Sequence, residues 1–534
     1  DSLRRFLRDN QDKLRASTRL GTSDNELGFD AAIWGKLAEL GVIGALFSEE
    51  DGGFAGAGFD LTTVFEELGR AGAVEPLLDT AILGGGLIAA LGTEAQKELV
   101  EQVVAGDLHL ALAHGEPNSR YDLAQVQTTA KTDGDDIVLN GRKAVVINAE
   151  ASDYLLVTAR EAGAAGDEAG ISLFLVPKLM VNDDGSLGET NGVSCGSIEK
   201  KMGIKGSATC VMNFDQAKGW LVGEENQGLA CMFTMMNYER LGVGIQSLGG
   251  AEASYQNAAD YARERIQSRA ATGPVAPEKA ADPIIVHADV RRMLMTMRAF
   301  NEAGRAFSTY VASYLDRAKF SSDESEVASA SNMVALLTPI AKGFMSDKAL
   351  DTSIIGQQVF GGHGYVREWG QEQLVRDIRI TQIYEGTNGI QAMDLMGRKV
   401  ALNGGQYVDQ LCADIRGFIA DNADGEFNSA LEKAVSLLQS TTATVLAQAG
   451  DDRNAVGAAA VDYMHLSGYV VYAFMWAKMA VVAEQKLAED ENFYGAKLAV
   501  ARFFYARLLP QASSHASNID AGSSSLMAMT AEQF

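Results

Sequence analysis

The most informative part of the chain reads Gln357-Gln-Val-Phe-Gly-Gly-His-Gly-Tyr365, then Val375-Arg-Asp377, then Gln382-Ile-Tyr-Glu-Gly-Thr-Asn-Gly-Ile-Gln391. Each piece is weak when taken singly. A Gly-Gly pair usually marks a helix C-terminus, and a lone glutamate before glycine is most often a solvated loop residue. No alternation of strands and helices surrounds the glycines, so a dinucleotide-binding fingerprint is excluded. The meaning of these motifs therefore depends on the rest of the chain.

The hydrophobic pattern changes period on the N-terminal side of these motifs. Residues 1–106 show helical spacing interrupted by glycine-rich breaks, which predicts a helical domain. Residues 107–224 change to a period of two, with short strands and a hairpin turn expected at Asn140-Gly141. Because the turns are too short for crossover helices, we expect an antiparallel sheet or barrel. The first two domains are thus predicted to be helical and β.

Helical patterns return on both sides of the glycine-rich motifs. They fill residues 225–402, where the proline-containing stretch 271–283 is expected to be a loop between long antiparallel helices. A second helical block, 403–534, begins at Asn403-Gly-Gly405 and ends in a Ser-rich, weakly patterned tail from Ser513. The predicted fold is mainly α with a middle β domain, and the four predicted domains follow these boundaries.

Composition excludes several classes of function. The chain has 534 residues, 47% of them hydrophobic, and a formal net charge of −25, which disfavours nucleic acid and anionic membrane surfaces as partners.

The apolar stretch from Leu466 to Ala483 contains polar residues and is typical of a buried bundle helix, so no membrane span is expected. The six histidines lack metal-ligand spacing, and we predict no metal. The four cysteines show no C-x-x-C pattern, and the chain as given does not open on a charged-then-apolar leader, so we expect a reducing, cytoplasmic location.

In their order and spacing, the motifs resemble those of the FAD-dependent acyl-CoA dehydrogenase family. The resemblance covers roughly residues 28–399 and implies bound FAD, an acyl-CoA thioester substrate and α,β-dehydrogenation. It also implies an N-terminal helical domain, a β-barrel-like sheet domain and a four-helix bundle. The block after Asn403 then corresponds to the extra C-terminal helical domain of some members.

Two branches of the family contribute to the resemblance. Residues 170–400 are most similar to the 3-methylthiopropanoyl-CoA dehydrogenases, through segments such as Lys201-Met-Gly-Ile204. Residues 1–160 are more similar to the small subunit of pimeloyl-CoA dehydrogenase, through Glu116-Pro-Asn-Ser-Arg-Tyr-Asp122 and Lys143-Ala-Val-Val-Ile-Asn148. Val145 and Ile147 stand where the family has the Trp and Thr of its Trp-Ile-Thr-Asn motif, so one flavin-orienting hydrogen bond is expected to be missing. Gly115, Arg120 and Tyr121 also depart from the family pattern.

Removal of the α-proton of a thioester needs a carboxylate base, a polarised carbonyl and a hydride acceptor beside the β-carbon. Glu385 is the expected catalytic base, and the resemblance implies that its backbone N–H helps to bind the thioester oxygen. Glu239 is the alternative base, because some relatives place the base on this earlier helix. We expect Glu239 instead to be a structural partner of Arg240, and Met232, Met235 and Met236 to be core residues.

The resemblance also implies binding residues. The expected substrate contacts are Asn237, Arg240 and Gly386, and the expected FAD contacts are Arg265, Gln358, Gly361, Gly362, Thr387 and Asn388. In the family the arginine that matches Arg265 reaches the flavin of a neighbouring subunit, so a homo-oligomer, at least a dimer, is expected.

Three functions remain open from the sequence. The first is an acyl-CoA dehydrogenase of fatty acid metabolism that passes electrons to an electron-transfer flavoprotein. The second is an acyl-CoA oxidase, or a related flavin oxidase on the same fold, which passes them to oxygen. The third is a non-catalytic assembly or interaction subunit, suggested by Val145, Ile147 and the altered Glu116 segment.

Overall fold

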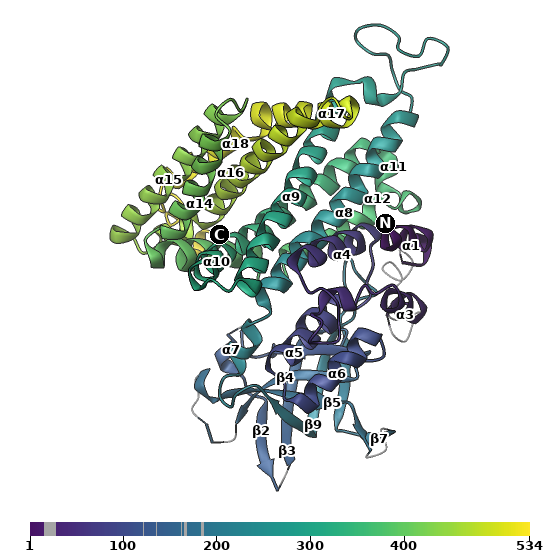
Figure 1. The fold of residues 1–534 in the computed structure, drawn as a ribbon, viewed down its shortest axis with the longest axis vertical. Coiled ribbons are helices and arrows are strands. Elements are labelled where there is room, and N and C mark those ends of the chain that lie inside the picture. Colours follow the sequence, from purple (N-terminus) through teal and green to yellow (C-terminus); the bar gives the residue numbers. More distant parts are fainter. Residues whose placement is uncertain (15–27, 121, 135, 162, 165–167, 183–185) are drawn as a thin grey trace. The chain divides into compact units, whose positions relative to one another are not determined.

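The structure is a computed structural model, and it describes residues 1–14, 28–120, 122–134, 136–161, 163–164, 168–182 and 186–534. The chain divides into two compact units, Asp1–Gly242 and Val243–Phe534 (Figure 1). The first contains helices and the sheet, and the second is helical. The predicted fold class, mainly α with a middle β domain and an extra C-terminal domain, is confirmed.

The first unit begins with short helices whose ends follow local capping rules. Asp30 accepts hydrogen bonds from the N–H groups of Ala32 and Ile33 and so starts a helix. Gly72 and Gly106 end two others in the left-handed conformation. The helices are α1 (Ser2–Asp9), α3 (Ala31–Glu39), α4 (Gly58–Ala71), α5 (Gly86–Leu91), α6 (Glu94–Ala105) and α7 (Gly228–Phe233).

The three glycines Gly84, Gly85 and Gly86 mark close packing. They end a π-helical segment, Leu78–Gly85, and begin α5. A Cβ on Gly84 would lie 2.3 Å from the Leu110 side chain, and one on Gly85 would lie 2.6 Å from a side-chain atom of Phe47. Any side chain at Gly84 or Gly85 would clash with these neighbours, so this cluster serves close packing.

The sheet domain is a closed ring of strands. β4 pairs with β2 and β5, and β9 pairs with β3 and β5, while β2 and β3 complete the ring. Apolar side chains fill its interior, among them Leu139, Leu155 and Met212. The strands are β1 (Leu110–Ala113), β2 (Thr129–Asp133), β3 (Asp136–Ile147), β4 (Tyr154–Glu161), β5 (Ile171–Pro177), β6 (Leu179–Val181), β7 (Leu187–Thr190), β8 (Val193–Ile198) and β9 (Thr209–Val222).

One expectation about the sheet is wrong, and a second is wrong in part. β3 runs straight through Asn140-Gly141, which form an irregularity in the pairing with β9, and the hairpin that joins β2 to β3 closes instead where Asp133 pairs with Asp136. The Asn140 side chain accepts a hydrogen bond from the Gln216 N–H, so the dipeptide serves a bulge rather than a turn. The sheet is also not wholly antiparallel, because β4 pairs in parallel with β1 and β2.

The part of the second unit that precedes residue 403 is built on the long helices α8, α9 and α10. Figure 1 shows α9 beside α10. The predicted loop at 271–283 is confirmed, since residues 265–287 connect α8 to α9. Asp282 organises this loop by accepting hydrogen bonds from the N–H groups of Ala270, Ala276 and Val275, which lower its pKa to about 2. The helices are α8 (Met236–Glu264, which begins in the first unit), α9 (Ala288–Phe320), α10 (Glu324–Val359), α11 (Gly362–Tyr365), α12 (Gln371–Arg379) and α13 (Asn388–Met393).

The C-terminal extension packs against α9 and α10 through α16. A Cβ on Gly468 would lie 2.3 Å from the Phe344 ring, so glycine permits a close approach of α16 to α10. The predicted Ser-rich tail from Ser513 is wrong in part, because α18 covers its beginning and buries Ala516 and Ile519. The extension consists of α14 (Gln406–Asp421), α15 (Asn428–Asp451), α16 (Ala455–Lys486), α17 (Glu491–Phe503) and α18 (Gln511–Asp520).

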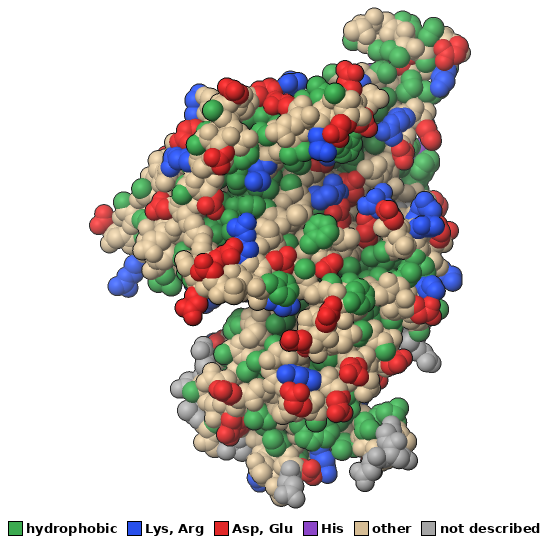
Figure 2. All heavy atoms as spheres, in the orientation of Figure 1, with side chains coloured by type: hydrophobic (Ala, Val, Ile, Leu, Met, Phe, Trp, Pro, Cys, Tyr) green, Lys and Arg blue, Asp and Glu red, His purple; other side chains and the backbone are tan. Residues whose placement is uncertain are grey.

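Helix α16 is long and apolar enough to cross a membrane, judged by length and composition alone. In the structure 78% of its most apolar window is buried inside the protein, as in the core helix of a folded domain. Figure 2 shows acidic and basic side chains interleaved over the visible face. The net charge of −25 is therefore not gathered into one block on this face.

Candidate active site

The loop that carries Glu385 is held in a strained conformation. Glu385 has a φ of 56° and Gly386 a φ of 80°, both in the left-handed region. For a residue with a side chain this costs about 1–3 kcal/mol and persists only where the surroundings enforce it. The Gln391 side-chain amide donates to the Glu385 carbonyl at 2.8 Å, and the Lys342 ammonium donates to the Gly386 carbonyl at 2.7 Å. Two successive carbonyls are thus fixed by side chains from α13 and α10.

The Glu385 carboxylate is half-buried. Among the described residues, no side chain forms a hydrogen bond or ion pair with it, and no acceptor meets the Glu385 backbone N–H. The neighbouring Tyr384 is anchored instead, because its hydroxyl donates to Gln246 Oε1 on α8 at 2.9 Å. The loop therefore presents one acidic side chain and one backbone donor that are available to a ligand.

Asp347 on α10 ties both ends of this loop to the helical bundle. Its Oδ1 accepts hydrogen bonds from the side-chain amides of Gln382 at 2.7 Å and Asn388 at 2.6 Å. Burial alone would raise the pKa of Asp347, but the hydrogen bonds from His465, Asn388 and Gln382 hold it below its ordinary value. Lys342, which is fully buried, also donates to Asn388 Oδ1 at 2.9 Å. Asn388 is thus a structural member of the loop in addition to being an expected FAD contact.

A histidine of the C-terminal extension completes this network. His465 Nε2 on α16 lies 2.9 Å from Asp347 Oδ2. The His465 ring stacks on His515 of α18 with centroids 5.1 Å apart, and His515 Nδ1 lies 2.7 Å from Asp462 Oδ1. A continuous series of polar contacts therefore joins the extension to the Glu385 loop.

A second group of expected FAD residues lies at the other end of α10. Gln358 and the exposed Gly361 and Gly362 stand at the C-terminal end of this helix, and Arg265 directly follows α8. Tyr261, one turn before Arg265, stacks on Phe360 at 4.2 Å and so joins the two helix ends. A Cβ added at Gly361 or Gly362 would meet no atom within 4 Å, which leaves their backbone open to a ligand.

The two groups are far apart along α10. The Glu385 loop is bonded near residues 342–347, whereas Gln358 is 11 to 16 residues further along, or roughly 16–24 Å at 1.5 Å per residue. Two expected FAD contacts, Thr387 and Asn388, belong to the Glu385 loop. The Thr387 hydroxyl caps α13 by accepting a hydrogen bond from the Ile390 N–H. The two groups would therefore contact distant parts of an extended cofactor, or cofactors in different subunits.

The expected substrate residues Asn237 and Arg240 lie in the first turns of α8, in the first unit. Gly386, the third of these residues, belongs to the Glu385 loop of the second unit. Glu239, the alternative base, is only 2% exposed. Met232 and Met236 are buried, which fits the expected core packing.

The β3 segment that departs from the family motif is built around a buried ion pair. Lys143 Nζ lies 2.8 Å from Glu116 Oε1 and 3.1 Å from Thr158 Oγ1. Within the irregularity of β3 between Lys143 and Val146, Val145 has a φ of 58° and is 50% exposed. Such a backbone is strained for a β-branched residue. Tyr121, another departure from the family pattern, lies outside the described residues.

Sequence reasoning did not assign Lys342, Asp347, Gln391 or His465 to the site. One signal was present, because Lys342 interrupts the apolar run Leu336-Leu-Thr-Pro-Ile-Ala-Lys-Gly-Phe-Met345, and a lysine buried in such a run needs a partner. The partners of Asp347 and His465 depend on packing between distant helices. Among the described residues, no group of three or more His, Cys, Asp or Glu side chains is arranged to hold a metal ion.

Comparison with known proteins assigns most of the chain to known domain families. Family models match in sequence order: acyl-CoA dehydrogenase N-terminal domain at 1–107, middle domain at 111–217, C-terminal domain at 226–400, and an acetyl-CoA dehydrogenase C-terminal-like domain at 411–530. The 3-methylmercaptopropionyl-CoA dehydrogenase of Ruegeria pomeroyi is 37% identical, over 84% of this chain and 78% of that protein. A butyryl-CoA dehydrogenase of Syntrophomonas wolfei is 34% identical, over 79% and 72%.

A solved structure shows the same fold along nearly the whole chain. The acyl-CoA dehydrogenase of Bacillus anthracis, solved in complex with FAD, matches 97% of this chain and 88% of its own with a TM-score of 0.78 and 22% identity. The match therefore extends through the helices that follow the catalytic bundle. By sequence, by domain order and by fold, this chain belongs to the acyl-CoA dehydrogenase family of FAD-dependent oxidoreductases.

Proposed function

We propose that this enzyme oxidises an acyl-CoA thioester at its α and β carbons, with Glu385 as the base that takes the α-proton. The unpartnered Glu385 carboxylate, on a strained loop fixed by Lys342 and Gln391, carries the proposal. Flavin-dependent acyl-CoA dehydrogenation itself follows from the family.

The proton transfer depends on two atoms of one residue. The Glu385 backbone N–H would donate to the thioester oxygen and stabilise the negative charge that develops when the α-proton leaves. The side chain would accept that proton, and closure around the acyl chain would desolvate the carboxylate and make it a stronger base. A fixed backbone keeps the donor and the acceptor in one relative position, which is what a concerted removal needs.

FAD, the cofactor of the family, supplies the hydride acceptor for the β-carbon when it is bound. The residues fit such a ligand, because the backbone at Gly361 and Gly362 is exposed with open space above it. Arg265, Gln358, Gly361 and Gly362 would hold one part of the cofactor, and Thr387 and Asn388 another. An absorbance spectrum of the purified protein tests this assignment, since acyl-CoA should bleach a bound flavin. A colourless, substrate-inert protein would instead favour the assembly-subunit alternative.

We propose short to medium acyl-CoAs as substrates, including sulfur-containing ones, with Asn237, Arg240 and Gly386 as contacts. The names of the Ruegeria and Syntrophomonas relatives support this range for those proteins. The measurement is turnover along a chain-length series. Equal turnover up to palmitoyl-CoA would contradict the proposal.

We propose an electron-transfer flavoprotein as the acceptor, and a role in fatty acid metabolism. The alternative, an acyl-CoA oxidase, uses oxygen. Peroxide release should be measured with a medium-chain acyl-CoA, with and without an artificial acceptor. Rapid peroxide formation without the acceptor would support the oxidase.

We also propose a homo-oligomer, at least a dimer. The separation between the Glu385 loop and the group around Arg265 supports a cofactor shared between subunits. Sedimentation of the flavin-loaded protein provides the test. A stable monomer that retains all its flavin would contradict a shared site.

A further inference from the structure

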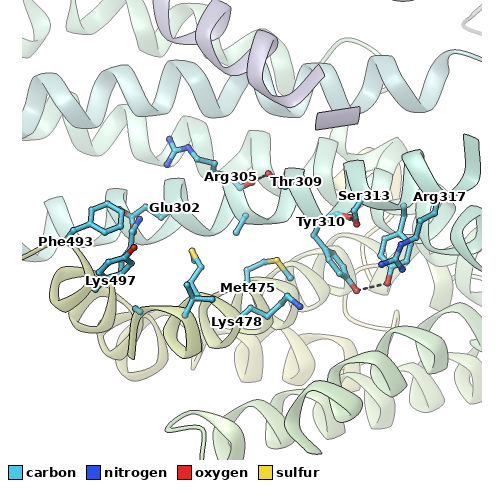
Figure 3. Close-up of a pocket in the computed structure, with 16 residues that line it drawn as sticks. Glu302, Arg305, Thr309, Tyr310, Ser313, Arg317, Met475, Lys478, Phe493 and Lys497 are labelled. Carbon is cyan, nitrogen blue, oxygen red and sulfur yellow. Dashed lines mark hydrogen bonds and ion pairs between the residues drawn. The ribbon is translucent and has the colours of Figure 1, made fainter. Parts of the chain in front are cut away.

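A pocket of about 640 Å³ lies between α9, α16 and α17, in the second unit (Figure 3). None of its lining residues belongs to the Glu385 loop or to the expected FAD groups. Its volume falls in the range of small-molecule sites, about 300–1,000 Å³. It is therefore a candidate for a second ligand.

The middle of the pocket is apolar and adaptable. Its lining includes Met475, Met479 and Val482 of α16 and Ala306 of α9. Figure 3 shows Phe493 of α17 at one end. Unbranched methionine side chains adjust to ligands of irregular shape. Phe493 and Val482 remain 50% and 48% exposed, so this apolar surface is incompletely covered by the chain itself. Such a surface suits an aliphatic chain.

The charge of the lining is opposite to that of the protein as a whole. Four lining residues are cationic, Arg305, Arg317, Lys478 and Lys497, and only Glu302 is anionic. The whole chain carries a net charge of −25. A local cationic site of this kind attracts anions against the global field.

The four cations differ in how far they are already neutralised. Lys497 lies 2.9 Å from Glu302, and Arg305 lies 3.4 Å from Glu252. Arg317 lies 3.9 Å from Glu326, which is a longer contact than the other two. Among the described residues, no carboxylate lies within ion-pair distance of Lys478, whose ammonium sits 5.1 Å and 5.4 Å from the rings of Phe474 and Phe418. Lys478 and Arg317 are therefore the cations best able to take an external anion.

Two tyrosines of α9, Tyr310 and Tyr314, also line the pocket, and Figure 3 shows Tyr310 at the same end as Arg317. The Tyr314 hydroxyl donates to Asp414 Oδ2 at 2.9 Å and lies 3.0 Å from the Tyr310 hydroxyl. Burial raises the pKa of Tyr314 to about 12 and raises that of Tyr310 as well, so both stay neutral. Asp414 accepts a hydrogen bond from the Tyr314 hydroxyl, which directs part of the charge of its carboxylate away from a ligand.

We propose that this pocket binds a medium-chain fatty acid, with its carboxylate at Lys478 and Arg317 and its chain over Met475 and Met479. The charge of the lining selects an anion, and the apolar middle selects an alkyl chain. The site is independent of the flavin chemistry, because no lining residue is shared with the Glu385 loop.

Calorimetric titration of the full-length protein with decanoate tests the proposal. We expect one site per chain, and much weaker binding of decyltrimethylammonium, which has the same tail and the opposite charge. Lys478→Glu should weaken decanoate binding by about tenfold or more, because it replaces an attraction with a repulsion. Lys486→Glu is the matched control, since Lys486 lies on the same helix outside the pocket and pairs with Glu489. It should bind decanoate as the parent protein does.

A second variant distinguishes loss of this site from misfolding, and a competing ligand distinguishes it from the acyl-CoA site. Met479→Trp fills the pocket and keeps every charge, so it should also abolish decanoate binding. Acetyl-CoA, which has no β-carbon to oxidise, should leave the binding intact when it occupies the substrate site. The proposal is overturned if decanoate does not bind, if Lys478→Glu or the cationic amphiphile binds equally well, or if acetyl-CoA displaces decanoate. Dissociation of an oligomer by Met479→Trp, without any decanoate binding by the parent protein, would instead assign this face to a second copy of the chain.

Discussion

His465 Nε2 lies 2.9 Å from Asp347 Oδ2, and the other oxygen of Asp347 holds both ends of the Glu385 loop. His465 belongs to the C-terminal extension, whereas Asp347 belongs to the catalytic bundle. A residue of the extension therefore orients a carboxylate that orients the loop. This arrangement makes the extension a part of the framework that holds the Glu385 loop.

We expect His465→Leu to lower kcat by about 10- to 100-fold, because a displaced loop misplaces the base relative to the α-proton. His465→Gln keeps a donor near Asp347 and should recover much of the lost rate. Rapid-mixing measurement of flavin reduction, with KM determined separately, provides the test. Equal losses in the Leu and Gln variants would mean that the ring packs but does not position the loop.

The pKa of Asp347 gives a prediction for acid stability. Its folded-state pKa lies below the ordinary value, so the ionised carboxylate stabilises the fold. This contribution is complete above the unfolded pKa of about 4 and is lost as the pH falls through the folded value. Asp347→Asn should therefore destabilise the protein most at neutral pH, and the difference should shrink in acid. Urea unfolding of both proteins at several pH values measures it, and a difference independent of pH would contradict this account.

Glu385→Gln keeps the shape of the side chain but removes the proton acceptor. General base catalysis is typically worth about two to four orders of magnitude, and we expect flavin reduction to fall by at least that much. Binding of acyl-CoA should survive, because the backbone N–H of the loop remains. Stopped-flow bleaching of the flavin at saturating substrate measures the loss.

Glu239→Gln is the matched control for this experiment. Glu239 is buried in the first turns of α8, and we expect its substitution to act through stability or CoA affinity. If Glu239→Gln abolishes bleaching while Glu385→Gln leaves it intact, the base lies on the earlier helix.

The sequence predicts those parts of the fold that depend on local periodicity. Helical spacing and alternation identify the three structural blocks because each pattern reflects one buried face. Asn140-Gly141 shows the limit of a local signal. The same dipeptide suits a hairpin turn and a bulge, and only the pairing of β3 with β9 selects the bulge.

The residues of the candidate site also divide into those that the local sequence predicts and those that depend on tertiary packing. Glu385 and its neighbours are predictable because they are consecutive in the sequence. Lys342, Asp347 and His465 reach the loop from 43, 38 and 80 residues away, through helix packing that no local pattern encodes. The Ser-rich stretch after Ser513 likewise becomes helical because α18 buries a narrow apolar face against the extension.

Removal of the extension should make the protein aggregate. A chain ending at Leu402 would expose the aromatic surface of α9 and α10 that α16 covers, including Phe300, Phe307 and Phe344. Exposed patches of this kind promote association. Solubility and light scattering of the truncated protein measure the effect. A soluble, active enzyme lacking residues 403–534 would show that the extension is dispensable.

Lys143→Met should destabilise the sheet domain strongly. The side chains of Lys143 and Glu116 are only 0% and 5% exposed, and their charged atoms lie 2.8 Å apart. Loss of the lysine leaves a buried carboxylate without its cation, which typically costs about 3–5 kcal/mol. In the double variant Lys143→Met with Glu116→Gln, the neutral amide removes the unpaired charge, and we expect most of the stability to return. Thermal and urea unfolding of the two single variants, Lys143→Met and Glu116→Gln, and of the double variant give the coupling energy. If Lys143→Met and the double variant are destabilised equally, packing of the Lys143 stem rather than the charge pair stabilises this part of β3.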